Sequence, residues 1–145
     1  MLVDANLLLF AVDEDSPFHA SARDWLTDRL NGPRRVGLPW QSLEAFLRIT
    51  THPRATPRPL EPEDAWERVA DWLACEVTWI PEPGERHADV LGELVVRHRV
   101  RGNLVPDARL AALALEHGLT VCSADTDFVR FTEVRWENPV ALGLG

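Results

Sequence analysis

The alternation of short apolar runs with longer amphipathic segments limits most strongly what this chain can fold into. Short, mostly apolar runs, which are typical of buried strands, lie at residues 2–4, 35–38, 77–80, 119–122 and 134–136. The segments between them place apolar residues at helical spacing, over residues 6–12, 16–31, 39–49, 63–74, 85–98 and 106–117. Buried strands that alternate with helices form parallel sheets covered on both faces. The sequence therefore predicts an α/β fold, a three-layer α/β/α sandwich with a mainly parallel sheet, as a single domain over residues 1–145.

Residue types that start and stop helices give the expected boundaries. Ser16 and Pro17 are expected to begin one helix, with Ser16 as its N-cap. Pro106 is expected to begin the last long helix and Gly118 to end it as a C-cap. The proline-rich stretch HPRATPRPLEP is predicted to be a loop, because proline interrupts helices and central strands.

Composition excludes several classes of protein. The net charge is −8 and all fifteen basic residues are arginine, so any mechanism that requires a lysine is excluded. Cys75 and Cys122 form no CxxC pair and the five histidines form no HExxH spacing, so we expect no zinc site. No stretch approaches the roughly 20 apolar residues of a membrane span, and the N-terminus lacks the basic segment of a signal peptide. We expect a soluble, cytoplasmic protein without a membrane partner.

Carboxylates stand where the predicted strands end or the following helices begin, which is where ligands bind in parallel sheets. Asp4 ends the first strand, Glu44 lies in the helix after the second strand, and Asp107 opens the last long helix. Asp125 and Asp127 follow the strand LTVC. These five acids come from four separate segments, and the predicted topology brings them to one edge of the sheet.

Each acid alone also has a purely structural explanation. Aspartates at helix starts cap the helix and interact favourably with its dipole. Glu44 could form a surface ion pair with Arg48, four residues later on the same helix. A cluster is harder to explain in this way, because two carboxylates about 4 Å apart repel each other by roughly 4 kcal/mol. A hard divalent cation removes that repulsion, so the cluster predicts a Mg²⁺ or Mn²⁺ site, and such a metal supports phosphodiester hydrolysis.

Several motifs together resemble the PIN-domain nucleases, particularly the VapC toxins of bacterial toxin–antitoxin pairs. The segments that resemble the family extend over nearly the whole chain and are VDANLLLFAVD, LPWQSLEAFLRITTHPR, LVPDARLAALALEHGLTVCSADTDFVRF and RWENP. Their order and spacing are more specific than any one motif. The resemblance implies a metal-dependent endoribonuclease that leaves a 3′-hydroxyl and a 5′-phosphate. It also implies a homodimer that binds RNA as substrate and a cognate, VapB-like antitoxin as partner.

The resemblance also implies roles for individual residues. The catalytic acids it implies are Asp4, Glu44, Asp107 and Asp125. The metal is expected on Asp4, Asp107, Asp125 and Asp127, and whether Glu44 and Asp127 bind it directly stays open. Polar residues expected to orient the acids, a water or a ligand are Asn6, Ser42 and Ser123.

Arginines and tryptophans are the remaining candidates for RNA contact. Arginine pairs bidentately with phosphate, and two groups could line an RNA path: Arg48, Arg54 and Arg58, and Arg97, Arg99 and Arg101. The alternative is an ordinary solvated arginine surface. Five of the six tryptophans are expected in the core or at a dimer interface: Trp25, Trp66, Trp72, Trp79 and Trp136. Trp40 is the exception, because it lies between Pro39 and the helix of Glu44.

Three other functions compete with the toxin interpretation. A haloacid-dehalogenase-type phosphatase would need a second aspartate where Asn6 stands, and a lysine, so the sequence argues against it. A PIN nuclease that processes RNA or cuts DNA without acting as a toxin remains open. So does a non-enzymatic binding module in which the acids only cap helices; metal dependence of activity separates this module from the nucleases.

Overall fold

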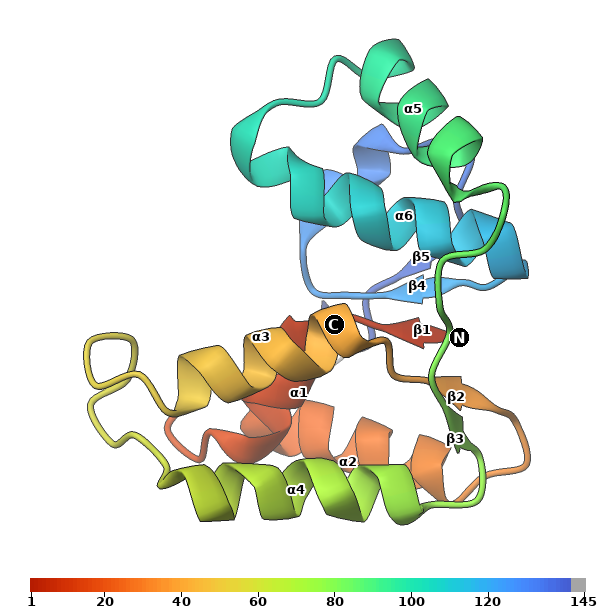
Figure 1. Cartoon of the computed structure of the whole chain (residues 1–145). Coiled ribbons are helices and arrows are strands. Elements are labelled where there is room, and N and C mark those ends of the chain that lie inside the picture. Colours follow the sequence, from red (N-terminus) through yellow and green to blue (C-terminus); the bar gives the residue numbers. More distant parts are fainter. Residues whose placement is uncertain (142–145) are drawn as a thin grey trace.

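Five very short strands form one sheet in the computed structural model, which describes residues 1–141. The strands are β1 (Leu2–Val3), β2 (Val36–Gly37), β3 (Thr78–Trp79), β4 (Val121–Cys122) and β5 (Trp136–Glu137). Their order across the sheet is β3-β2-β1-β4-β5, and every pairing is parallel (Figure 1). The carboxyl ends of all five strands therefore lie at the same edge. The last four residues of the predicted domain lie outside the described residues.

Helices cover both faces of this sheet, because the consecutive residues of the central strands β1 and β4 are apolar and buried on both sides. Leu2 and Val121 belong to one core cluster, whereas Val3 and Cys122 belong to the other. The cluster that contains Val3 and Cys122 packs under α1 (Ala5–Val12), α2 (His19–Leu30), α3 (Trp40–Thr50) and α4 (Pro62–Ala74). The cluster that contains Leu2 and Val121 packs under α5 (His87–Arg97) and α6 (Val105–His117), which lie together in the upper half of Figure 1. The predicted three-layer α/β/α sandwich is confirmed.

The ends of several elements differ from the predicted ones. Helix α2 begins at His19, so the prediction that Ser16 caps it is wrong: the Ser16 hydroxyl accepts the N–H of Phe18 in a turn before the helix. The last strand begins later than predicted, because the N–H of Val134 bonds to the carbonyl of Phe131 in a turn. Gly118 ends α6 in the left-handed conformation, with φ 65°, as its glycine predicted.

Close contact between β2 and its neighbours requires glycine at position 37. A Cβ atom on Gly37 would lie 2.9 Å from the carbonyl oxygen of Met1 and 2.9 Å from the Pro81 side chain. The N–H of Gly37 donates to that same Met1 carbonyl at 2.9 Å. This approach fixes β2 beside β1 and so fixes the start of α3, which follows β2. Within residues 1–141, no helix combines the length and apolarity needed to cross a membrane.

Candidate metal centre

Three aspartates from two segments meet at the carboxyl edge of the sheet. Asp107 lies in the first turn of α6, and Asp125 and Asp127 lie at the start of the 3-10 helix η2 (Thr126–Arg130). One carboxylate oxygen of each lies within 4.8 Å of the other two, so the three could contact one ion. Helix α6 starts at this position because Pro106 suits the first turn of a helix, and Val105 directly follows the short 3-10 helix η1 (Gly102–Leu104).

Asp4 faces the same group from the end of β1. Its Oδ1 accepts the N–H of Ala5 at 2.7 Å, so Asp4 also caps α1. The charges of Asp4 and Asp125 each act on other members of the cluster: Asp125 raises the pKa of Asp4, and Asp4 raises the pKa of Asp107. Asp4 can therefore cap α1 and belong to the group of acids at the same time. Asp125 shows the same combination, since its Oδ1 accepts the N–H of Asp127 at 2.8 Å.

Ser123 and Asn6 hold the Asp4 carboxylate in place. The fully buried Ser123 hydroxyl donates to Asp4 Oδ2 at 2.7 Å. It accepts the Asn6 side-chain amide and the Asp125 N–H, each at 3.0 Å. Asn6 Oδ1 in turn accepts the N–H of Ala124 at 3.2 Å. This network ties the end of β1 to the segment after β4, which orients two of the acids relative to each other.

The first turn of α3 is tied to the two segments that present Asp4 and Asp107. The buried Ser42 hydroxyl donates to the carbonyl of Val3 at 2.6 Å, directly before Asp4. Gln41 Nε2 donates to the carbonyl of Pro106 at 2.8 Å, directly before Asp107. The family resemblance implied a role for Ser42 but none for Gln41. Only the polar Gln41-Ser42 pair at the start of an otherwise apolar helix could have indicated it.

Burial and mutual repulsion raise the pKa values of the clustered acids. Burial, followed by the charges of Asp125, Asp4 and Asp127, raises the pKa of Asp107 to about 7. Burial also raises the pKa of Asp4, although its hydrogen bonds from Ser123 and Ala5 oppose this rise. These carboxylates lie close together and repel one another. A hard divalent cation such as Mg²⁺ or Mn²⁺ prefers oxygen ligands, so the group suits such an ion. No thiol or imidazole among the described residues joins the group.

Glu44 lies apart from this group in the structure. Its side chain is exposed on α3, and it is not among the charges that shift the pKa of Asp4 or Asp107. The aspartates that share the possible metal position do not include it. The catalytic role of Glu44 stays a prediction.

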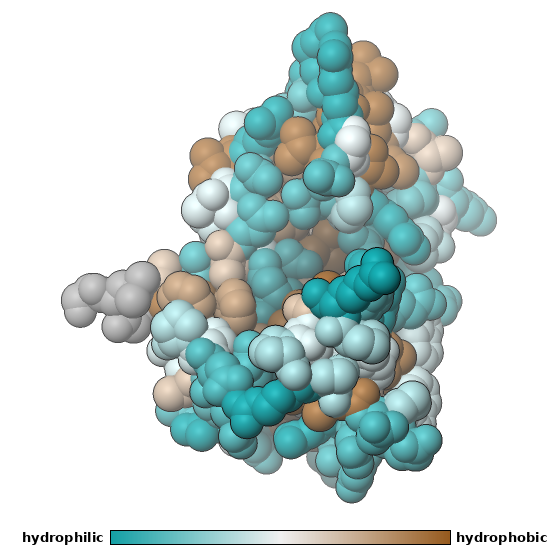
Figure 2. Space-filling model, turned by 90° about the vertical axis from the view of Figure 1, so that its left-hand side faces the viewer, coloured by the Kyte–Doolittle hydropathy of each residue, from teal (hydrophilic) through white to brown (hydrophobic). Residues whose placement is uncertain are grey.

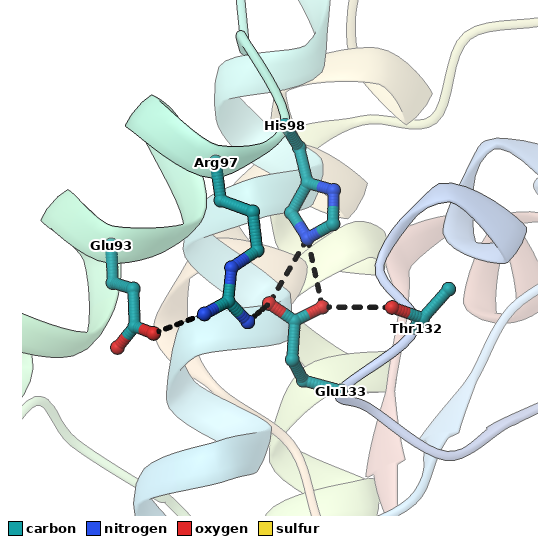
Figure 3. Close-up of polar contacts among 5 residues, drawn as sticks. All are labelled: Glu93, Arg97, His98, Thr132 and Glu133. Carbon is teal, nitrogen blue, oxygen red and sulfur yellow. Dashed lines mark hydrogen bonds and ion pairs between the residues drawn. The ribbon is translucent and has the colours of Figure 1, made fainter.

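The arginines proposed for RNA contact lie in different surroundings. Arg48, Arg99 and Arg101 are exposed, and Arg58 pairs with Asp15. The guanidinium of Arg97 lies between two carboxylates, 2.9 Å from Glu93 and 3.3 Å from Glu133 (Figure 3).

Glu133 also contacts a histidine and a hydroxyl. Its carboxylate lies 2.8 Å from His98 Nε2 and accepts the Thr132 hydroxyl at 3.3 Å (Figure 3). Burial raises the pKa of Glu133, but a backbone hydrogen bond at Glu133, the hydrogen bond with His98 and the charges of His98 and Arg97 outweigh it and lower the pKa. The Arg97 side chain is nevertheless 55% exposed, and its contact with RNA stays a prediction.

The side of the molecule on which α6 begins is hollowed. Figure 2 views this side and shows a recess with a hydrophilic floor between the half that contains α5 and α6 and the half that contains α1 to α4. A parallel sheet between helices, with clustered aspartates at its carboxyl edge, defines an α/β protein whose candidate site offers the oxygen ligands that suit a divalent cation.

Comparison with known proteins identifies the family. Residues 1–134 match the family model of the PIN domain. The chain is 46% identical over 141 residues to ribonuclease VapC37 of Mycobacterium tuberculosis, covering 97% of this chain and 98% of that protein. It is 36% identical over 140 residues to ribonuclease VapC33 of the same species, covering 97% of this chain and 98% of that protein. The chain belongs to the PIN-domain family and, within it, to the VapC ribonucleases.

Solved structures share the fold at low sequence identity. VapBC2 from Rickettsia felis, bound to a DNA fragment from its promoter, matches with a TM-score of 0.69 and 15% identity, covering 94% of this chain and 96% of that one. VapC20 of M. tuberculosis, a toxin that cleaves the sarcin–ricin loop, matches with a TM-score of 0.67 and 19% identity, covering 92% of this chain and 98% of that one. These likenesses show that the arrangement in Figure 1 is that of the PIN fold.

Proposed function

We propose that this protein is a divalent-metal-dependent endoribonuclease and the toxin of a VapBC-type toxin–antitoxin pair. The observation that supports the chemistry most strongly is the group formed by Asp107, Asp125 and Asp127, with Asp4 facing it. The relatives at up to 46% identity over nearly the whole chain are ribonucleases by name, which supports RNA as the substrate.

The aspartates would hold Mg²⁺ or Mn²⁺, which lowers the pKa of bound water and neutralises charge on a phosphoryl oxygen. Asp4, Asp107 and Asp125 are the proposed main ligands, and Asp127 completes the group. Ser123 holds Asp4 through a hydrogen bond that favours the ionised carboxylate, the form that binds a cation. Glu44, which is exposed on α3, is proposed as a further catalytic acid on the resemblance to the family alone.

The test is cleavage of a mixed pool of structured and single-stranded RNA with Mg²⁺, with Mn²⁺ and with EDTA, beside the Asp4→Asn variant. We expect cleavage with either metal, none with EDTA, and almost none with the variant. Cleavage by the variant at the wild-type rate would contradict the proposed site. Expression in bacteria tests the toxin role: wild-type protein should arrest growth, and Asp4→Asn should not. A nuclease of ordinary RNA processing would cleave without arresting growth.

An antitoxin is the proposed protein partner. Structures of similar fold are described as VapBC complexes, including VapBC-1 from nontypeable Haemophilus influenzae. In this chain, a groove of about 500 Å³ runs along the ends of α1 and α3 and the loop before α4. Leu9, Phe10 and Leu60 contribute apolar lining, and Asp13 and Arg68 contribute charge. We place an amphipathic antitoxin segment there, and Phe10→Asp should abolish co-purification with the antitoxin while RNA cleavage by the free protein persists. A homodimer is also proposed, and light scattering would measure it.

A further inference from the structure

Two of the six tryptophans, Trp40 and Trp66, are exposed and lie outside both core clusters. Trp25, Trp72 and Trp136 pack in or against the two core clusters. Trp79 has the guanidinium of Arg35 over its ring, 4.1 Å from the centroid. Trp40 and Trp66 belong to neither cluster among the described residues, and their exposed fractions are 36% and 50%.

Trp40 differs from Trp66 in its position. It is the first residue of α3, directly after the chain leaves β2 at the carboxyl edge of the sheet. The next residue, Gln41, donates to the carbonyl that precedes Asp107, and Ser42 donates to the carbonyl that precedes Asp4. Trp40 therefore directly precedes the two residues that connect α3 to the segments of Asp4 and Asp107. Trp66 lies on α4, which packs mainly against α3 and β3.

The surroundings of Trp40 suit a nucleotide. Trp40 is 36% exposed, so part of this large apolar residue is open to a ligand. Aromatic side chains of this kind stack on the bases of single-stranded nucleic acids. The stacking position would therefore lie at the first turn of α3.

We propose that Trp40 stacks on an unpaired RNA base next to the scissile phosphate and so helps to select where the chain is cut. This inference rests on the proposed ribonuclease function and adds a binding position to the same site. Gln41 and Ser42 act as positioning residues for it, because they fix the first turn of α3 to the segments that present the metal-binding acids. The net charge of −8 makes such stacking valuable, since bulk electrostatic attraction cannot supply the affinity.

A double perturbation of protein and substrate tests the proposal. In an RNA whose cleavage site has been mapped, each nucleotide around that site is replaced in turn by an abasic one. With wild-type protein, one abasic position should lower kcat/KM about 10-fold. Trp40→Leu should lower kcat/KM for the intact RNA by a similar factor and should be nearly insensitive to the same abasic replacement. Trp66→Leu is the matched control and should behave as the wild type does. The same abasic profile in Trp40→Leu and the wild type would overturn the proposal.

Two further readouts keep this result separate from the proposed function. A short single-stranded RNA should quench the protein's fluorescence, and Trp40→Phe, but not Trp66→Phe, should remove most of that quenching. If the wild type cuts no RNA but this quenching depends on Trp40, the nuclease assignment fails and the stacking position stands. If RNA binds without Trp40-dependent quenching, the stacking position fails even when cleavage occurs. A change from dimer to monomer in Trp40→Leu, measured by light scattering, would instead make Trp40 an interface residue and overturn the proposal.

Discussion

Removing one carboxylate from the cluster should make the metal-free protein more stable. In the folded chain the pKa of Asp107 is raised from 3.8 to about 7. The folded state therefore binds more protons than the unfolded state between these values, and stability falls as the pH rises through that window. Above pH 7 the full penalty remains. Asp107→Asn has no charge to bury, so it avoids this penalty while it keeps nearly the same shape.

The size of the effect follows from the shift and from the exposure of the site. A shift of about three units corresponds to about 4 kcal/mol for a fully shielded group. Asp107 is only partly buried, and solvent screening reduces the figure to roughly 1–2 kcal/mol. For a chain of this length, that raises the melting temperature by about 5 °C. At pH 4.5 most of the difference should vanish, because Asp107 is then protonated in the folded wild type.

Thermal unfolding in EDTA at pH 8 and at pH 4.5 measures this effect. Asp89→Asn is the matched control, since Asp89 also lies in the first turn of a helix but outside the cluster. It should not raise the melting temperature. With Mn²⁺ at about 100 times its Kd, the wild type should gain about 2.7 kcal/mol and the Asp107 variant much less. If Asp107→Asn melts at or below the wild-type temperature at pH 8 in EDTA, repulsion among the carboxylates does not destabilise the metal-free protein and this reasoning is refuted.

Three further substitutions separate metal binding, positioning and folding. Ser123→Ala removes the donor to Asp4 and should lower Mn²⁺ affinity about 10- to 100-fold by calorimetry. Gln41→Ala frees the segment before Asp107; unfolding should become easier by about 1 kcal/mol, and kcat should fall with little change in KM. Gly37→Ala should destabilise the fold by about 1–3 kcal/mol in denaturant titrations, since its Cβ would contact the neighbouring backbone at 2.9 Å.

The layers of the fold could be predicted from the sequence because they follow from local patterns. Apolar runs and helical spacing are properties of neighbouring residues, and they were sufficient for a sandwich with a parallel sheet. The strand order β3-β2-β1-β4-β5 depends instead on contacts between distant segments, such as Leu2 with both Gly37 and Val121. The Ser16 prediction failed because a serine suits a turn as well as a helix cap, and local sequence does not distinguish the two.

The site was predictable to the extent that its residues follow strands or begin helices. Because Asp107, Asp125 and Asp127 stand at such positions, the sequence predicted that they would lie together, and in the structure they do. Gln41 could not be found in the same way, because its hydrogen bond reaches a carbonyl 65 residues away. Likewise, arginines that are close in sequence do not reveal which acidic residues of distant segments will pair with them. Glu133, which lies 3.3 Å from Arg97, is an example.

The most direct test of the central claim compares Mn²⁺ binding with Mn²⁺-dependent RNA cleavage in the same protein sample. We expect the Mn²⁺ concentration for half-maximal cleavage to match the Kd from calorimetry, and both to rise together in Ser123→Ala. Cleavage that persists in EDTA, or whose Mn²⁺ dependence does not change when the binding affinity does, would contradict the claim that the aspartate cluster is the catalytic metal site.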